Sequence, residues 1–152
     1  PPGIVSDDLQ NALVLVPGCS PVKPSKRWPG AAFASLAVLA RQHGHRLFIV
    51  GTSADRNAAD AVLQGAPDCT DLVGKTDLPQ LAALFARCGY VIGNDTGPVF
   101  LAARTGTPTL MVMGSDTDPA MSAPAGARAG WVRAAPISDV TPAQAFAALL
   151  KL

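Results

Sequence analysis

Short apolar runs alternate with longer polar-and-apolar segments along the whole chain. A continuous apolar run closed by turn residues is typical of a strand buried on both faces of a parallel sheet. The expected strands lie at residues 13–16, 47–50, 71–73, 90–93 and 109–113, with a further short one near 131–133.

The segments between these runs have the spacing of helices. Gly44 and Gly65 are expected to end two of them, and Asp77 and Thr141 are expected to cap two others. The alternation predicts right-handed crossovers and an α/β, doubly wound (Rossmann-like) parallel sheet. The helices are expected at 31–43, 54–64, 78–87 and 99–104, with a last one from residue 142.

A doubly wound sheet binds its ligand at the carboxyl ends of the strands. That rule selects the loops 17–30, 51–55 and 93–98, with 114–119 as a fourth candidate. All four loops hold the polar and glycine residues that the strands lack.

Length and composition narrow the class of protein. The 152 residues are expected to form one domain, residues 1–152, and 49% hydrophobic against 15% charged residues exclude a disordered chain. A net charge of +1 argues against nucleic acid as a partner. No apolar run is long enough to span a membrane. The chain begins at Pro1 rather than at Met, which indicates a fragment or a processed protein.

The three cysteines, Cys19, Cys69 and Cys88, are odd in number and widely spaced. This spacing favours free thiols in a reducing cytosol over a zinc site or a disulfide framework.

The loop 93–98 carries the clearest chemical signal. It joins a strand directly to a helix, whose first turn exposes backbone N–H groups and a partial positive charge. Thr96 can cap this helix, Gly97 allows close approach of a ligand, and Pro98 suits its first turn. The loop therefore predicts an anion site for a group such as phosphate. The alternative is a plain helix cap made by Asp95 or Thr96.

The loop 17–30 adds positive charge at the same edge. Lys23, Lys26 and Arg27 could hold a diphosphate; alternatively, this is a solvated basic loop with Trp28 packed in the core. No GxGxxG or Walker motif follows the first strand, which argues against NAD and against a P-loop.

Other polar groups give weaker signals. Asp55 could bind a ribose hydroxyl, or it could complement a helix start. Asp116 and Asp118 lack the pattern of a calcium loop, and His43 and His45 are expected at a helix end. No catalytic triad, paired carboxylates or metal-spaced histidines stand out. Spacing alone thus supports an anion- or nucleotide-binding domain.

Four segments in order resemble the motifs of the family 9 glycosyltransferases, the lipopolysaccharide heptosyltransferases of Gram-negative bacteria. They are Pro17-Gly18-Cys19-Ser20 with Lys26-Arg27-Trp28-Pro29, Gly74-Lys75-Thr76-Asp77-Leu78, Gly93-Asn94-Asp95-Thr96-Gly97-Pro98, and Gly114-Ser115-Asp116-Thr117-Asp118-Pro119.

The resemblance implies the nucleotide-sugar-binding C-terminal domain of a GT-B enzyme, whose two Rossmann-like domains face a cleft. It implies transfer of heptose from ADP-heptose to the lipopolysaccharide inner core, with inversion and without a metal or other cofactor. The acceptor site and the catalytic base would belong to an N-terminal domain absent from this chain, so that the domain alone would be inactive. The implied location is the cytoplasm, with peripheral association of the full-length protein at the inner face of the inner membrane.

Carried onto this sequence, the resemblance makes Lys26 the partner of the diphosphate and Asp95 a ligand of sugar hydroxyls. Thr96 and Gly97 would offer backbone N–H groups to the phosphates. The full set of implied substrate-binding residues is Ser20, Lys26, Asp55, Asp95, Thr96, Gly97 and Pro98. The chain departs from the family pattern DTGPxH at Phe100, which stands in place of the histidine and removes a polar donor.

Two alternatives stay open at this point. The domain could be a non-catalytic nucleotide-binding or interaction module that has kept the fold, as Phe100 suggests. It could also belong to a different GT-B enzyme that uses UDP or GDP. All three hypotheses require a diphosphate site between Lys26 and the helix that follows Asp95.

Overall fold

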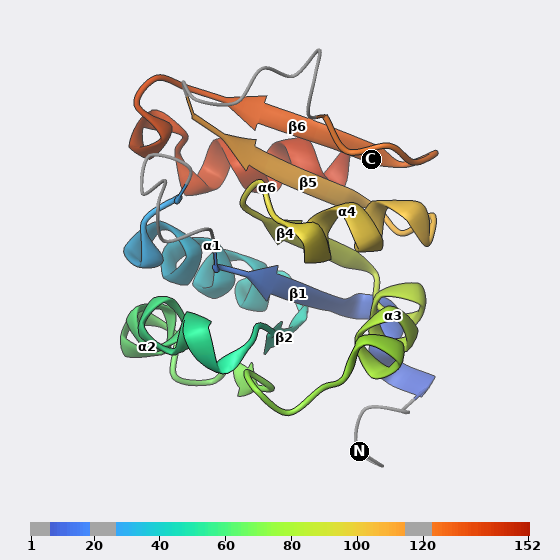
Figure 1. The fold of residues 1–152 in the computed structure, drawn as a ribbon. Coiled ribbons are helices and arrows are strands. Elements are labelled where there is room, and N and C mark those ends of the chain that lie inside the picture. The colour runs from blue at the N-terminus through green and yellow to red at the C-terminus, as the bar shows by residue number, and fades with distance from the viewer. Residues whose placement is uncertain (1–6, 19–26, 115–122) are drawn as a thin grey trace.

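One parallel β-sheet organises the chain in the computed structural model, which describes residues 7–18, 27–114 and 123–152. Within those residues the strand order is β3-β2-β1-β4-β5-β6, and every neighbouring pair is parallel (Figure 1). This order confirms the doubly wound α/β prediction. The strands are β1 (Ala12–Val16), β2 (Arg46–Ile49), β3 (Thr70–Asp71), β4 (Tyr90–Gly93), β5 (Thr109–Met113) and β6 (Ala129–Arg133).

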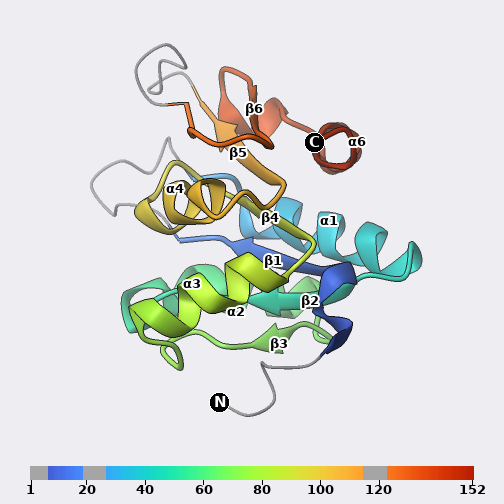
Figure 2. The same cartoon turned by 90° about the vertical axis from the view of Figure 1, so that its right-hand side faces the viewer.

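Helices cover both faces of the sheet. Figure 2 shows α1 and α6 on one side and α3 and α4 on the other, and α2 packs beside α1. The helices are α1 (Gly30–Gln42), α2 (Arg56–Gly65), α3 (Leu78–Arg87), α4 (Gly97–Arg104) and α6 (Pro142–Leu150).

An apolar layer lies on each side of the sheet. Trp28, Phe33 and Phe146 belong to the layer under α1, α2 and α6. Phe85 and Met111 belong to the layer under α3 and α4. All five residues of β1 are buried, because both of its faces are covered, and this is why its sequence shows a continuous apolar run rather than an alternation.

In a doubly wound sheet a ligand crevice forms where the strand order changes direction, and here that point lies between β1 and β4 at the centre of the sheet. The chain builds β1, β2 and β3 outward and then returns to place β4 on the other side of β1, with Val16 opposite Gly93. The segment after β1 leads to α1 and the segment after β4 leads to α4, which lie on opposite faces. Such a topological switch point is where doubly wound sheets bind ligands.

Most predicted elements are confirmed, and the differences have local causes. The predicted ranges 78–87, 90–93 and 109–113 agree with α3, β4 and β5 to the residue. The predicted strand at 71–73 is wrong by about a residue or two, since β3 pairs with β2 only at Thr70 and Asp71. The helix expected from residue 54 begins later, because a 3-10 turn over Ser53–Asp55 precedes α2.

The two helix-ending glycines play different roles. Gly44 follows α1 with φ +89, as a helix stop requires. Gly65 is the last residue of α2, so it ends that helix as predicted, but it does so without a positive φ. A Cβ on Gly65 would lie 2.7 Å from the Cβ of Ala34, and one on Gly30 would lie 2.5 Å from the Cβ of Ala61. These two glycines therefore let α1 and α2 pack closely.

None of the helices in the described ranges has the length and apolar character that a membrane span needs.

Candidate functional site

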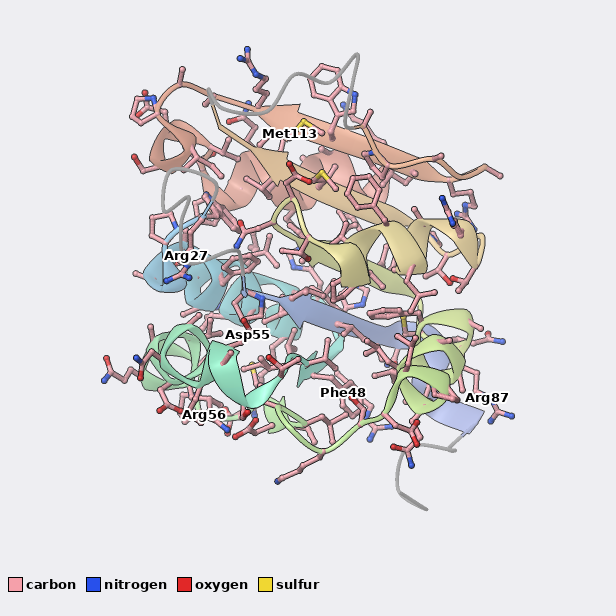
Figure 3. The ribbon with its side chains drawn as sticks, in the orientation of Figure 1. Arg27, Phe48, Asp55, Arg56, Arg87 and Met113 are labelled. Atoms are coloured by element: carbon pink, nitrogen blue, oxygen red, sulfur yellow. The ribbon has the colours of Figure 1, made fainter. Side chains whose placement is uncertain are left out.

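The candidate site lies where β1 and β4 end side by side. Pro17 and Gly18 follow β1, and Asn94, Asp95 and Thr96 follow β4. Figure 1 shows the strands pointing toward one edge of the molecule, and Figure 3 shows the side chains of Arg27 and Asp55 at that edge. Two of the loops that the sequence selected, 17–30 and 93–98, therefore meet at the switch point.

Asn94 joins these two loops and is completely buried. Its Oδ1 accepts a hydrogen bond from the backbone N–H of Trp28 at 2.8 Å. Its Nδ2 donates to the carbonyl of Pro17 at 2.9 Å, and the carbonyl of Gly18 lies 3.5 Å from the same nitrogen. One side chain thus contacts the first loop both where it begins and where it ends.

Trp28 anchors the end of that loop in the core. Its ring is fully buried and packs edge-on against Phe33, with centroids 4.8 Å apart. Its indole N–H donates to the carbonyl of Val140 at 2.9 Å, so the ring is held by polar and apolar contacts. The prediction that Trp28 packs in the core is confirmed. This packing does not decide between the two interpretations of the lysines, since Trp28 can anchor a binding loop as well as a solvated one.

The turn between β4 and α4 leaves polar groups without protein partners. Thr96 occupies the N-cap position of α4, but its side chain makes no capping hydrogen bond. Its hydroxyl oxygen is buried and has no hydrogen-bond partner among the described residues. Side-chain capping by Thr96, one form of the alternative interpretation, is therefore wrong. Thr96 still shapes the turn, because its carbonyl accepts from the N–H groups of Val99 and Phe100 at 3.2 and 3.3 Å.

Gly97 is the exposed first residue of α4. A Cβ built on it would meet nothing within 4 Å, so there is open space above this backbone. Pro98 has no N–H to offer, and the N–H of Gly97 makes no hydrogen bond within the described part of the chain. The start of α4 can therefore accept an anion from solvent, as its partial positive charge favours.

Asp55 lies against both neighbouring loops. Its Oδ2 accepts hydrogen bonds from the N–H and the hydroxyl of Thr52, at 2.9 and 3.3 Å. A Cβ on Gly18 would lie 2.3 Å from its Oδ1, and one on Gly51 would lie 2.8 Å from its Oδ2. These bonds support the helix-start interpretation of Asp55. Its role toward a ribose stays a prediction, which the position of the carboxylate beside the crevice permits.

A cavity of 180 Å³ opens beside the loop that follows β1. A larger hollow of 360 Å³ lies between the carboxyl halves of α1 and α2, away from the switch point. Because ligands of doubly wound sheets bind at the switch point, the smaller cavity is the more relevant one. Its lining residues are Pro17, Arg27, Trp28, Gly30, Asn57, Ala58 and Ala61.

The carboxyl group of Asp71, at the end of β3, has a pKa that differs from its ordinary value. Burial acts to raise its pKa, but hydrogen bonds from Arg56 at 2.8 Å and from the N–H of Val73 at 3.0 Å outweigh burial, and the pKa is lowered. Arg56 also bonds Asp60 of the same helix at 2.9 Å, while its bond to Asp71 links α2 to β3. These charges are engaged with one another and serve to hold the edge together.

Several predicted residues lie outside the described ranges: Cys19, Ser20, Lys23, Lys26, Asp116 and Asp118. Within those ranges, no group of three histidine, cysteine, aspartate or glutamate side chains is arranged to hold a metal ion.

The remaining histidines and cysteines have structural environments. Nδ1 of His43 lies 2.9 Å from the carbonyl of Leu39, at the end of α1, as predicted for a helix-end residue. His45 contacts the carbonyl of Asn11 at 2.8 Å. Burial raises the pKa of Cys69 to about 11 and that of Cys88 to about 12, so both free thiols stay protonated near neutral pH.

Asn94 is the functional candidate that the sequence interpretation missed. Its type gives a signal, since a primary amide both donates and accepts, directly after a strand that is otherwise apolar. Its partners, however, are backbone groups 66 and 77 positions away, which local pattern does not reveal.

Comparison with known proteins adds a family. A family model described as glycosyltransferase family 9 (heptosyltransferase) matches residues 6–144. Lipooligosaccharide heptosyltransferase 2 of Haemophilus influenzae is 30% identical over 115 residues, which are 72% of this chain and 33% of that protein. The chain therefore spans about a third of the length of this relative.

Solved structures agree with the fold. The structure of ADP-heptose lipopolysaccharide heptosyltransferase II of E. coli superposes with a TM-score of 0.85 at 24% identity, over 99% of this chain and 50% of that one. E. coli heptosyltransferase WaaC with ADP gives a TM-score of 0.79 at 24% identity, over 90% and 42%. The Rossmann-like fold is thus the one found in the GT-B architecture of these enzymes.

Proposed function

This chain belongs to glycosyltransferase family 9, the heptosyltransferases, and from that premise we propose that its switch-point crevice binds the ADP part of a nucleotide-sugar donor such as ADP-heptose. The observation that carries the proposal is the turn after β4. There a buried hydroxyl on Thr96 and the N–H of Gly97 have no hydrogen-bond partner among the described residues, and the space at the Cβ position of Gly97 is open.

The chemistry of a diphosphate fits these groups. The start of α4 supplies an N–H group and a partial positive charge, and the ammonium of Lys26 would supply a full charge. Asp95, next to this turn, would accept hydrogen bonds from sugar hydroxyls. Asp55, between Gly18 and Gly51, would face the ribose with the oxygen that Thr52 does not use. Ser20 and Pro98 complete the proposed substrate-binding set.

In the proposed reaction the bond between the anomeric carbon and the diphosphate oxygen breaks, and ADP leaves with the electron pair. A hydroxyl of the lipopolysaccharide core attacks from the opposite side and forms the new glycosidic bond, with inversion. A base outside this chain takes the proton of that hydroxyl. Lys26 and the α4 turn would stabilise the charge that grows on the leaving diphosphate, so the proposed transfer needs no metal or other cofactor.

Phe100 favours a second candidate, a nucleotide-binding module without transfer. Its side chain is half-buried and packs against the apolar layer under α4, so it offers no hydrogen bond to a ligand. We expect the chain by itself to bind ADP and to transfer no sugar. If the full-length protein also transfers nothing from several nucleotide-sugars, the second candidate is the better one.

The test is a titration of the chain with ADP, UDP and GDP, followed by amide NMR shifts. We expect ADP to bind with a dissociation constant on the order of 1 mM and more tightly than UDP or GDP. Lys26→Ala should weaken binding about tenfold, because a charge-assisted contact to phosphate is lost. Lys151→Ala, at the end of α6, is the matched control and should leave binding unchanged. Absence of ADP shifts, or equal binding by both variants, would contradict the proposal.

A further inference from the structure

Asn94 stands out among the buried polar side chains. Within the described ranges the buried polar residues are Asn94, Thr107 and Thr109. Thr107 and Thr109 precede or begin β5, at the amino end of the sheet, where they bond the nearby carbonyls of Phe85 and Thr107. Asn94 lies at the carboxyl end, in the crevice itself. A polar group placed there is costly unless it is fully bonded, which makes its partners informative.

The amide of Asn94 fits its surroundings in one orientation. The backbone N–H of Trp28 can only donate, so it must meet Oδ1, and the carbonyl of Pro17 can only accept, so it must meet Nδ2. The carbonyl of Gly18, 3.5 Å from Nδ2, approaches from the same side as that of Pro17. Among side chains of this size, only an amide both donates and accepts in this way without first taking up a proton.

These bonds fix both ends of the segment between Gly18 and Trp28. The next residues after Asn94 are Asp95, Thr96 and Gly97, which form the proposed phosphate turn. One side chain therefore sets where the first loop begins and ends relative to the start of α4. An ordinary helix cap or turn residue bonds within a few positions of itself, whereas these bonds cross 66 and 77 positions.

We propose that Asn94 is a positioning residue for the nucleotide, a clamp that holds the chain at Pro17, Gly18 and Trp28 against the turn of Thr96 and Gly97. This inference rests on the proposed function, because it assigns to Asn94 the geometry of that same site. Asn94 itself has both ends of its amide bonded to the chain, so it acts through the loop rather than by touching the ligand.

The variant Asn94→Asp separates positioning from simple packing. The carboxylate keeps the shape and still accepts from Trp28, but its second oxygen faces the carbonyls of Pro17 and Gly18. Burial and these carbonyls favour the protonated form, which regains a donor toward Pro17. The clamp should therefore be broken at high pH and re-formed at low pH.

The expected result is a pH-dependent loss of ADP affinity that the unaltered chain does not show. Relative to the unaltered chain at the same pH, Asn94→Asp should bind ADP about tenfold more weakly near pH 8 and within about threefold near pH 5. Among the described charged residues, Asp95 follows Asn94 directly, Arg27 precedes Trp28, and Asp55 lies against Gly18. Because both proteins carry these groups, the ratio cancels their titration. The protonation of ADP itself is the same in both experiments at a given pH.

A second measurement follows the clamp without any ligand. Hydrogen exchange of the Trp28 amide should speed up in Asn94→Ala at every pH, because its acceptor is lost. It should speed up in Asn94→Asp near pH 8, because repulsion between the carboxylate and the carbonyls of Pro17 and Gly18 makes the clamp open more often. Thr107→Val is the matched control, since it removes a buried hydroxyl bond far from the crevice. It should lower stability while leaving ADP affinity and Trp28 exchange unchanged. ADP affinity and Trp28 exchange are both measured well below the unfolding temperature of each variant.

The outcomes distinguish the two ideas. If the unaltered chain binds neither ADP nor ADP-sugar, the proposed function fails and the clamp loses its purpose. If the unaltered chain binds ADP and Asn94→Asp binds it equally at all pH values, or behaves like Thr107→Val, the function stands and the positioning role is overturned. The positioning role is supported if the ratio of the ADP affinities of Asn94→Asp and the unaltered chain depends on pH and Trp28 exchange is faster in the variant.

Discussion

At the scale of single residues, the missing side chain of Gly97 gives a sharp test of the phosphate turn. A Cβ there meets nothing in the protein, and Gly97 does not have a positive φ. We expect Gly97→Ala to leave the free energy of unfolding unchanged or raised by about 0.5 kcal/mol, since alanine favours helix. The same methyl group would occupy the space of the phosphate. ADP affinity, measured by titration, should therefore fall by about tenfold.

Gly44→Ala is the control for this variant. Gly44 also has open space around it, but its φ of +89 is strained for alanine. We expect it to lower stability by about 1 kcal/mol while ADP binding is retained. An ADP affinity unchanged by Gly97→Ala would show that the phosphates do not lie at the start of α4.

At the scale of elements, the close packing of α1 on α2 depends on two glycines. Gly65 leaves only 2.7 Å between a built Cβ and the Cβ of Ala34. Gly65→Val should therefore push the helices apart and lower the free energy of unfolding by about 2 kcal/mol. Gln64→Ala, the exposed neighbour in the same helix, should change it little. Chemical denaturation measures both, and equal midpoints would contradict this account of the packing.

The contact between α2 and β3 should depend on pH through Asp71. Its pKa is lowered in the folded chain, so the ionised carboxylate contributes stability above its unfolded pKa of about 3.9, and this contribution is lost as the pH falls through the folded value. Asp71→Asn should thus be destabilising at neutral pH and lose its effect under strongly acidic conditions. Asp60→Asn removes the more exposed partner of Arg56 and should have the smaller effect. Denaturation midpoints across pH measure the difference, and a pH-independent difference would contradict it.

At the scale of the whole molecule, the local pattern of apolar and polar residues predicts the layers of the fold but does not predict the long-range contacts. Strands such as β1 and β5 are buried on both faces, so their apolar runs are visible in the sequence. The ends of α3 were predictable because the capping box of Asp77 with Gln80 is a local arrangement. The role of Gly65 was not, because it depends on Ala34 in another helix.

The candidate site likewise has a part that the sequence predicts and a part that it does not. The turn of Asp95, Thr96 and Gly97 was predictable, because strand, turn and helix follow one another in the sequence. The approach of Asp55 to Gly18 could not be predicted, since it arises only when β1 and β2 lie side by side, whereas the bonds of Asp55 to Thr52 are local. Long-range hydrogen bonds from a neutral side chain leave no periodicity in the sequence.

The amide of Asn94 has a consequence for engineering. Because the amide of Asn94 and the buried ring of Trp28 secure the chain at Pro17 and Trp28, a graft between Gly18 and Trp28 would keep both of its attachment points. That stretch can be replaced by the matching segment of another family 9 protein without redesign of the interior. Such a graft would test whether the stretch between the two attachment points decides which nucleotide is bound.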